Sequence, residues 1–105
     1  MEVTAMVITE DGQRLVFSHN ASDKVTVWNI KDRAIEETID CPSPGPMISR
    51  GVKTFIGNTM GGTISILKHT DWTFAKPVEA GTNRINSLTA PQGRYFKGTI
   101  LISSH

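Results

Sequence analysis

Cysteine is nearly absent from this chain of 105 residues, because Cys41 is the only one. A single cysteine cannot form an intrachain disulfide, which suits a reducing compartment. The sequence also lacks an apolar run long enough for a secretory signal or a membrane span, and its first residues carry an acid where a signal would carry bases. We therefore expect a soluble intracellular protein, cytoplasmic unless it enters the nucleus.

The chain also lacks a charge excess of either sign. Eleven Lys and Arg residues stand against 10 Asp and Glu residues, and no block of like charge occurs. Electrostatic binding to a nucleic acid or to a membrane surface depends on such blocks. We therefore expect no nucleic-acid partner and no membrane partner.

A helical period is missing as well, and what the sequence contains instead is an internal repeat. Leu15–Ile39 aligns with Thr54–Val78 at an offset of 39 residues without a gap, and apolar and polar classes agree at most positions. Upstream, Met6-Val7 corresponds to Met47-Ile48 at an offset of 41, and Leu88 follows after another 41 residues. The final "LISSH" is similar to "VFSH" of the first unit. The chain therefore reads as one domain, residues 1–105, of two full units, about 1–40 and 45–80, and half of a third, about 84–105.

Each unit reads as four short β-strands separated by turns. In the first unit we expect strands at Val3–Thr9, Arg14–His19, Lys24–Ile30 and Ala34–Ile39. In the second unit, the segment "TDWTFAKPV" corresponds to this fourth strand, and we expect a strand there as well. The linking segment "CPSPGP", Cys41–Pro46, has three prolines, which forbid a helix and predict an exposed connection.

Four short antiparallel strands on a period of about 40 residues, with a tryptophan near the end of the third strand, are typical of a propeller blade. The segment "DGQRLVFSHNASDKVTVWNIKD" resembles the WD40 repeat family. The resemblance implies an all-β fold, a partial β-propeller of four-stranded antiparallel blades, for which a β-sandwich is the alternative. Its structural blade positions would be Ser18, Asp23, Trp28 and Leu67.

Trp28 is expected to pack against a neighbouring blade, with its indole N–H bonded to Ser18 or Ser22. The sequence departs from the family pattern in several places. Asn29 follows Trp28 where the family has Asp, the family's Gly-His pair is missing, and Leu67 replaces the tryptophan in the second unit. The hydrogen-bond network that is typical of the family is therefore incomplete in both units.

No motif in the sequence carries clear chemistry. The glycine-rich segment Gly57–Thr63 lacks the Lys-Ser/Thr ending and the helix of a phosphate loop, and reads as a hairpin turn. His69 and Asp71 are too few for a metal site, and Cys41 has no base beside it. We therefore expect no catalytic residues, no metal and no cofactor.

Blades bury their faces only against other blades, so two and a half blades leave a ring incomplete. The missing blades would come from a longer protein, which we favour, from copies of this chain, or from another protein's propeller. By resemblance, the function is that of a non-catalytic scaffold for protein–protein contacts. The alternatives are a self-assembling fragment that closes a ring and, in another class, an enzyme domain on a propeller or a β-sandwich.

Such propellers usually bind partners through the turns at one end of the blades. In this sequence those turns are Asn20–Asp23, Asp40–Pro46, Asn58–Gly62 and Ala80–Arg84. The expected partner-binding residues are Asn20, Ser22, Asp40, Ser43, Asn58, Met60, Asn83 and Arg84.

Overall fold

The structure is a computed structural model, and it describes residues 2–79, 87–89 and 101–103. The described residues form β-strands and one 3-10 turn, so the fold is all-β as expected. In chain order the elements are β1 (Ala5–Ile8), β2 (Arg14–His19), η1 (Asn20–Ser22), β3 (Lys24–Asn29), β4 (Ala34–Asp40), β5 (Pro44–Arg50), β6 (Lys53–Asn58), β7 (Thr63–Lys68), β8 (Val78–Glu79), β9 (Ser87–Thr89) and β10 (Leu101–Ser103).

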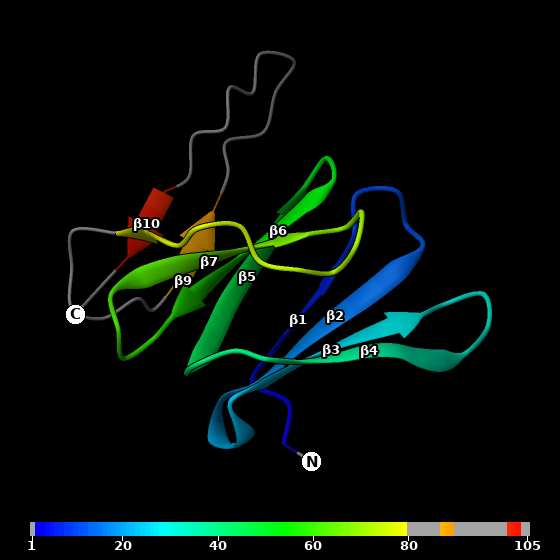
Figure 1. The fold of residues 1–105 in the computed structure, drawn as a ribbon, viewed down its shortest axis with the longest axis horizontal. Helices are drawn as coiled ribbons and strands as arrows, with labels where there is room; N and C mark the ends of the chain where they lie inside the picture. Colours follow the sequence, from blue (N-terminus) through cyan, green and yellow to red (C-terminus); the bar gives the residue numbers. More distant parts are fainter. Residues whose placement is uncertain (1, 80–86, 90–100, 104–105) are drawn as a thin grey trace.

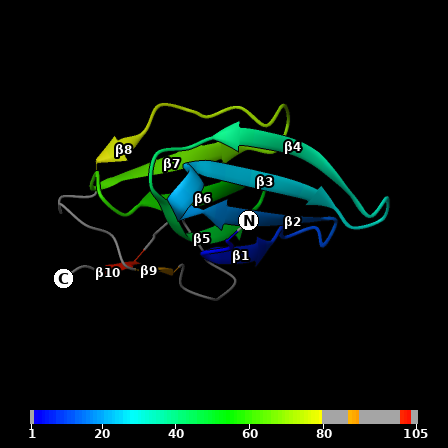
Figure 2. The ribbon, with the colours of Figure 1, turned by 90° about the horizontal axis from the view of Figure 1, so that it is seen from below.

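The strands form two four-stranded antiparallel sheets and one strand pair, each ordered as in the sequence. We call β1–β4 the first sheet and β5–β8 the second sheet. β9 and β10 pair antiparallel. Figure 1 shows β5 between β1 and β9, and Figure 2 shows β1, β9 and β10 on one side of the molecule, with β4 and β8 on the other. The sheets therefore follow one another in a row, and the first strand of each sheet lies on the same side of the molecule.

Alternation along the strands determines which side chains enter the core. Val16 pairs with Val27 and Ser18 with Val25, so these four side chains share one face of the first sheet. They are buried, whereas Phe17 between them faces the other way and is half-buried. The β1–β2 turn is fixed by Asp11, whose carboxylate accepts bonds from the Thr9 hydroxyl at 2.7 Å and the Gln13 N–H at 2.9 Å.

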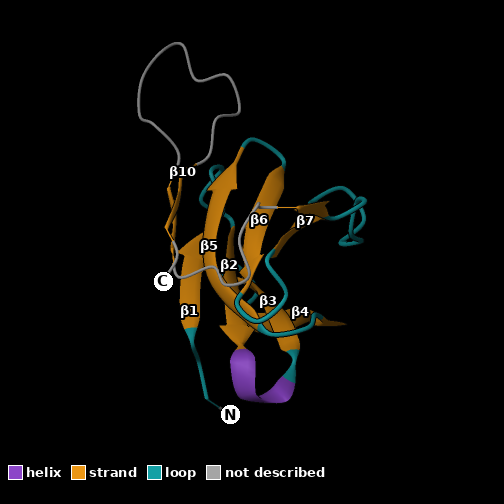
Figure 3. Ribbon diagram, turned by 90° about the vertical axis from the view of Figure 1, so that its left-hand side faces the viewer, coloured by secondary structure: helices purple, strands orange, loops and turns teal. Residues whose placement is uncertain are grey.

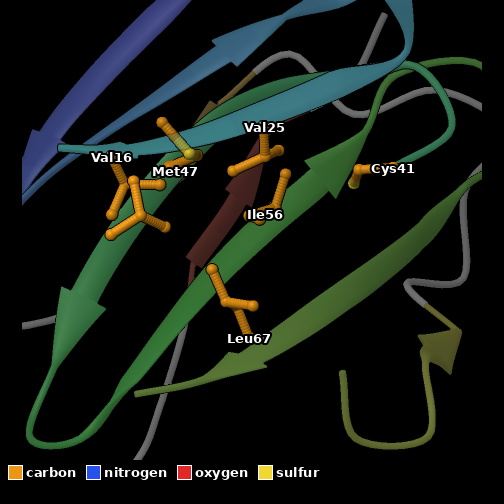
Figure 4. Close-up of a cluster of buried hydrophobic side chains, with 7 residues drawn as sticks. Val16, Val25, Cys41, Met47, Ile56 and Leu67 are labelled. Atoms are coloured by element: carbon orange, nitrogen blue, oxygen red, sulfur yellow. The ribbon is translucent and has the colours of Figure 1, made fainter. Parts of the chain in front are cut away.

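The core lies between the two sheets. The first sheet contributes Val16, Val25 and Val27, and the second contributes Met47, Ile56 and Leu67, with Cys41 from the connection between them. Figure 4 shows these side chains meeting between the sheets. Complete burial of one such aliphatic side chain is worth about 1.5–3 kcal/mol. The core therefore holds the two sheets as a single packed unit.

The prediction for Cys41–Pro46 was wrong. Cys41, Pro44 and Gly45 are buried, and β5 begins at Pro44, so half of this segment belongs to a strand. Proline is tolerated there because β5 is an edge strand of its sheet and its register shifts between Pro44 and Met47, where the ladder is interrupted.

The fourth strand of the second unit is shorter than expected. Its described pairing consists of an isolated bridge between Leu67 and Phe74 and the two residues of β8. Trp72 adopts a left-handed conformation with φ of 57°, which interrupts an extended strand. Pro77 before β8 lacks the N–H that a ladder requires.

Candidate functional site

Three segments from different parts of the sequence meet at one end of the two sheets. They are the β2–β3 turn with η1, Asn20–Asp23, the connection Cys41–Pro44, and the β6–β7 turn Thr59–Gly62. We call them together the loop platform. Figure 3 shows η1 of this group as the helical turn at the end of the first sheet, on the side where the N-terminus lies.

Asn20 joins all three segments of the loop platform. Its side-chain amide donates to the Pro44 carbonyl oxygen at 3.2 Å and to Thr59 Oγ1 at 3.1 Å. Thr59 stands 39 residues after Asn20, which is the repeat offset, so equivalent positions of the two units bond to each other. Thr59 was not among the expected site residues, but this equivalence was a signal that could have identified it.

Asp23 and Ser43 hold the connection in place. The Ser43 N–H donates to Asp23 Oδ1 at 2.9 Å, and the Cys41 N–H donates to the Asp23 carbonyl oxygen at 3.0 Å. The Thr59 N–H in turn donates to the Ser43 carbonyl oxygen at 2.9 Å. Asp23 and Ser43 both have positive φ, 54° and 44°, so hydrogen bonds keep a strained backbone in one conformation.

Met60 and Ser22 are among the side chains that the loop platform turns outward. Met60 is 70% exposed, at the tip of the β6–β7 turn, and Ser22, the last residue of η1, is exposed. Asp40 at the rim is exposed and forms an ion pair with Lys24. The platform therefore presents one large apolar side chain above a framework of polar groups that bond to one another.

Asn58 does not belong to the exposed surface, so its assignment to a partner-binding loop is corrected. It is 3% exposed, and its amide donates to Thr63 Oγ1 at 2.7 Å and to Ser65 Oγ at 2.9 Å. Its side-chain oxygen Oδ1 accepts from the Cys41 thiol at 3.7 Å. The amide group is thus used inside the protein. Asn83 and Arg84 lie outside the described residues.

Cys41 is a structural thiol in this fold. It is 1% exposed, and burial raises the pKa of the thiol to about 11. Because the thiolate is the reactive form, this thiol is a poor nucleophile at neutral pH.

The residues expected at structural blade positions differ in burial and in the face of the sheet on which they lie. Leu67 is fully buried in the core. Trp28 is half-buried on the other face of its sheet, and no hydrogen bond of its indole occurs within the described residues. Ser18 donates instead to the Gly45 carbonyl oxygen at 3.0 Å, and Ser22 is exposed. The expected partner of the Trp28 indole is therefore corrected, because Ser18 faces the second sheet and Trp28 faces away from it.

A second polar group, which the sequence did not indicate, lies at the opposite end of the sheets. Glu36 of β4 accepts bonds from Arg14 Nε at 3.1 Å, Asn29 Nδ2 at 3.0 Å and Trp72 Nε1 at 2.8 Å. We call these four residues the Glu36 cluster. Trp72 also stacks at 35° on His69, with ring centroids 5.1 Å apart. Trp72 lies in the connection between β7 and β8, so its bond joins the second unit to the edge strand β4 of the first sheet.

A hollow of about 470 Å³ adjoins the Glu36 cluster, lined by Gly12, Gln13, Arg14, Asn29, Ile30 and Lys31. In the part of the chain that the structure describes, no group of three or more His, Cys, Asp or Glu side chains is placed to hold a metal ion. Within the same part, no helix has the length and apolar composition needed to cross a bilayer.

Comparisons of the sequence with family models and with curated proteins gave no match. The fold, in contrast, matches solved structures. Hydrazine synthase of Kuenenia stuttgartiensis is similar with a TM-score of 0.74 and 12% identity, over 82% of this chain and 25% of that chain. The WD40 repeats of RRP9 and the structure of U3-55K are each similar with a TM-score of 0.72 and 13% identity, over 83% of this chain and 27% of theirs.

These likenesses concern the fold and not the sequence. The chain spans about a quarter of the length of the three solved structures. One of them bears the name of an enzyme, so the fold by itself does not decide whether a protein is catalytic. Since two of them are WD40 repeat structures, the two sheets are blades of an all-β, WD40-like β-propeller, and the β-sandwich alternative is set aside.

Proposed function

We propose that this chain is a non-catalytic scaffold that binds other proteins through the loop platform. One observation carries the proposal: hydrogen bonds fix three turns of two blades to one another, beneath an exposed Met60. Binding residues are commonly found on loops that a rigid framework positions. The WD40 repeat structures among the similar folds support an interaction role.

The chemistry of the loop platform suits a protein or peptide ligand. Met60 is flexible and polarisable, so it adapts to an apolar pocket or an aromatic ring of a partner. Interfaces commonly combine an apolar centre with a polar rim, and the rim would be formed by Ser22, Ser43 and Asp40. We propose the cytoplasm as the compartment, with support from the single, free cysteine.

The proposal is tested with peptides selected from a random library displayed on phage. The chain is immobilised, enriched peptides are synthesised with a fluorophore, and their dissociation constants are measured by anisotropy. We expect Met60→Asp to weaken binding about tenfold or more, since an interface anchor contributes over about 1.4 kcal/mol.

Val52→Asp is the matched control. Val52 is also exposed, at 62%, but it lies in the β5–β6 turn away from the loop platform. We expect it to bind the selected peptides as the unchanged chain does. Peptides that bind equally well to Met60→Asp, or that are lost only with Val52→Asp, would show that the platform is not the binding site.

A further inference from the structure

Charge is divided unevenly along this chain, although the net charge is near zero. Residues 1–40 contain eight Asp and Glu residues and four Lys and Arg residues. Residues 41–105 contain only two acids, the last of which is Glu79, and seven Lys and Arg residues. The first unit is therefore acidic and the rest of the chain is basic. A charge difference of this kind between parts of one chain points to a partner of opposite charge.

Three of these bases lie side by side at one end of the second sheet. Arg50 pairs with Lys53, and Lys53 pairs with Lys68, so their side chains share one face of β5, β6 and β7. We call these three residues the basic row. Figure 1 shows the β5–β6 turn, drawn in green, beside the β1–β2 turn and away from the loop platform. Like charges directly opposite each other destabilise a sheet, so the basic row has a cost that a bound anion would remove.

The acids close to the basic row are bonded to other groups. Glu10 reaches the β5–β6 turn, where its carboxylate accepts from a backbone N–H at 2.5 Å. Asp71 is exposed and accepts from the Thr73 hydroxyl at 2.6 Å, and this bond lowers the pKa of the Asp71 carboxyl more than the charge of Lys68 does. Within the described residues, neither Lys53 nor Lys68 forms an ion pair. The two lysines therefore carry charges that no acid of this part of the chain neutralises.

The first unit shows which group belongs beside such side chains. Lys53 stands 39 residues after Arg14, which is the repeat offset, and Lys68 stands 39 residues after Asn29. Arg14 and Asn29 pair with each other as the two lysines do. Both donate to the carboxylate of Glu36, Arg14 Nε at 3.1 Å and Asn29 Nδ2 at 3.0 Å. At this place in the repeat, the first unit therefore contains a bound carboxylate.

The second unit lacks this carboxylate. The residue 39 positions after Glu36 is Ala75. The bridge between Leu67 and Phe74 repeats a pairing of the first unit, so the two outer segments have the same register at this point. The Ala75 N–H donates to the carbonyl oxygen of Ile66 at 2.8 Å, which holds Ala75 beside β7. The second unit thus keeps the donors of the site and adds cations, but it has no acid for them.

We propose that the basic row binds a carboxylate from an acidic segment of a partner protein, in the place that corresponds to Glu36 of the first unit. A carboxylate is the ligand because the equivalent donors of the same chain already bind one. Hydrogen bonds between an ammonium group and a carboxylate are stronger than those between neutral groups. Because Arg50 Nη1 donates to the carbonyl oxygen of Ser49 at 3.0 Å, the recognition rests on Lys53 and Lys68. The basic row is a second contact surface, separate from the loop platform.

The test is the binding of a polyglutamate peptide that carries a fluorophore, measured by anisotropy. A polyglutamine peptide of the same length is its control. We expect the chain to bind only the polyglutamate, more weakly as salt is added, because salt screens exposed charges. Lys53→Gln should raise the dissociation constant about fivefold or more. Lys31→Gln removes the same charge from the exposed β3–β4 turn and should change it by less than about twofold.

Ala75→Glu gives the second unit the acid that the first unit has. Its carboxylate should occupy the proposed site, so we expect polyglutamate binding to weaken about tenfold or more and the thermal midpoint to rise. Ala75→Gln has nearly the same shape without the charge and should do neither. Circular dichroism verifies the fold of each variant, and Lys68→Gln replaces Ala75→Glu if that variant does not fold.

Three results would overturn the proposal. The first is a folded chain that does not bind polyglutamate at low salt, and the second is binding that neither Lys53→Gln nor Ala75→Glu weakens. The third is a phosphoserine peptide of equal charge that binds about tenfold more tightly than polyglutamate, which would assign the basic row to phosphate groups. Met60→Asp should bind polyglutamate as the unchanged chain does, so this proposal and the loop platform can fail separately.

Discussion

Glu36 joins the two blades at the end opposite to the loop platform. Its carboxylate accepts from Arg14 and Asn29 of its own sheet and from Trp72 of the next one. The Asn29 amide, followed by Arg14 and Trp72, holds the pKa of the Glu36 carboxyl below its ordinary value, while desolvation opposes this. The folded state therefore favours the charged form of Glu36.

Glu36→Ala should lower the free energy of unfolding by roughly 1–2 kcal/mol, between the values for an exposed ion pair and for a bond to a buried charge. The substitution removes the acceptor of three hydrogen bonds at once, one of which comes from the other blade. Glu37→Ala is the control, because Glu37 is exposed in the same strand, and its effect should stay within about 0.5 kcal/mol. The measurement is urea unfolding. Equal losses in the two variants would show that the cluster contributes nothing specific.

Two groups near this end contribute to the pH dependence of stability. Burial is the main cause that lowers the pKa of His69 from 6.5, so below that pH the unfolded chain binds more protons than the folded chain. Stability should therefore fall as the pH drops below 6.5. The depressed pKa of Glu36 adds a second loss as the pH falls below 4.5, where its charge is stabilising only in the folded state.

His69→Gln separates the two contributions. Unfolding curves at pH 7.5, 5.5 and 4 measure both contributions. The variant should lose most of the change in the free energy of unfolding between pH 7.5 and pH 5.5. A slope between pH 7.5 and 5.5 that is the same in both proteins would assign that change to another group.

At the residue scale, sequence reasoning located buried apolar positions better than hydrogen-bond partners. Leu67 was identified through the repeat offset and is fully buried. Trp28 was expected to be the bonded tryptophan, yet Trp72 is the one whose indole donates, to Glu36. Alternation shows which strand residues share a face of the sheet, but it does not show which face packs against the neighbouring sheet. The hydrogen-bond partner of either tryptophan therefore cannot be read from the sequence alone.

At the scale of elements, the strands of the first sheet and most turns followed from alternation and turn residues. Arg14–His19 has the expected bounds, and β3 and β4 differ from the expectation by one residue each. β5 could not be predicted in the same way, because its three leading residues are Pro44, Gly45 and Pro46. The Ser18 hydroxyl of the first sheet donates to the Gly45 carbonyl oxygen, and Thr59 of the β6–β7 turn packs against Gly45. Both contacts come from residues distant in the sequence, so local sequence does not reveal them.

Gly45 gives a test at this scale. A Cβ at Gly45 would collide with Thr59 Cγ2 and lie 3.3 Å from the Gly57 carbonyl oxygen. Gly45→Ala should therefore destabilise the chain by about 1–3 kcal/mol, as overpacked sites do. Adding Thr59→Ser removes Cγ2 and keeps the hydroxyl that accepts from Asn20, so most of the loss should be recovered in the double variant. Thermal unfolding of the two single variants and the double variant checks this; additive losses would contradict the contact.

At the scale of the whole molecule, the repeat period was sufficient for the fold class, because blades have a fixed number of strands and a fixed order. The period did not show which face of each blade docks on the other, since both faces of the third strands contain apolar residues. It also did not show that the loop platform depends on blade docking. Asn20 reaches Thr59 only because Val16, Val25 and Val27 pack against Met47, Ile56 and Leu67.

The docking of the two blades is the claim on which the loop platform depends, and methyl NOE spectroscopy measures it most directly. With Val, Ile, Leu and Met methyl groups labelled, the structure predicts cross-peaks from Val16, Val25 and Val27 to Met47, Ile56 and Leu67. Met6 should show none to those three residues. Cross-peaks confined to pairs within one sheet, or contacts from Met6 to the second sheet, would contradict the arrangement of the blades.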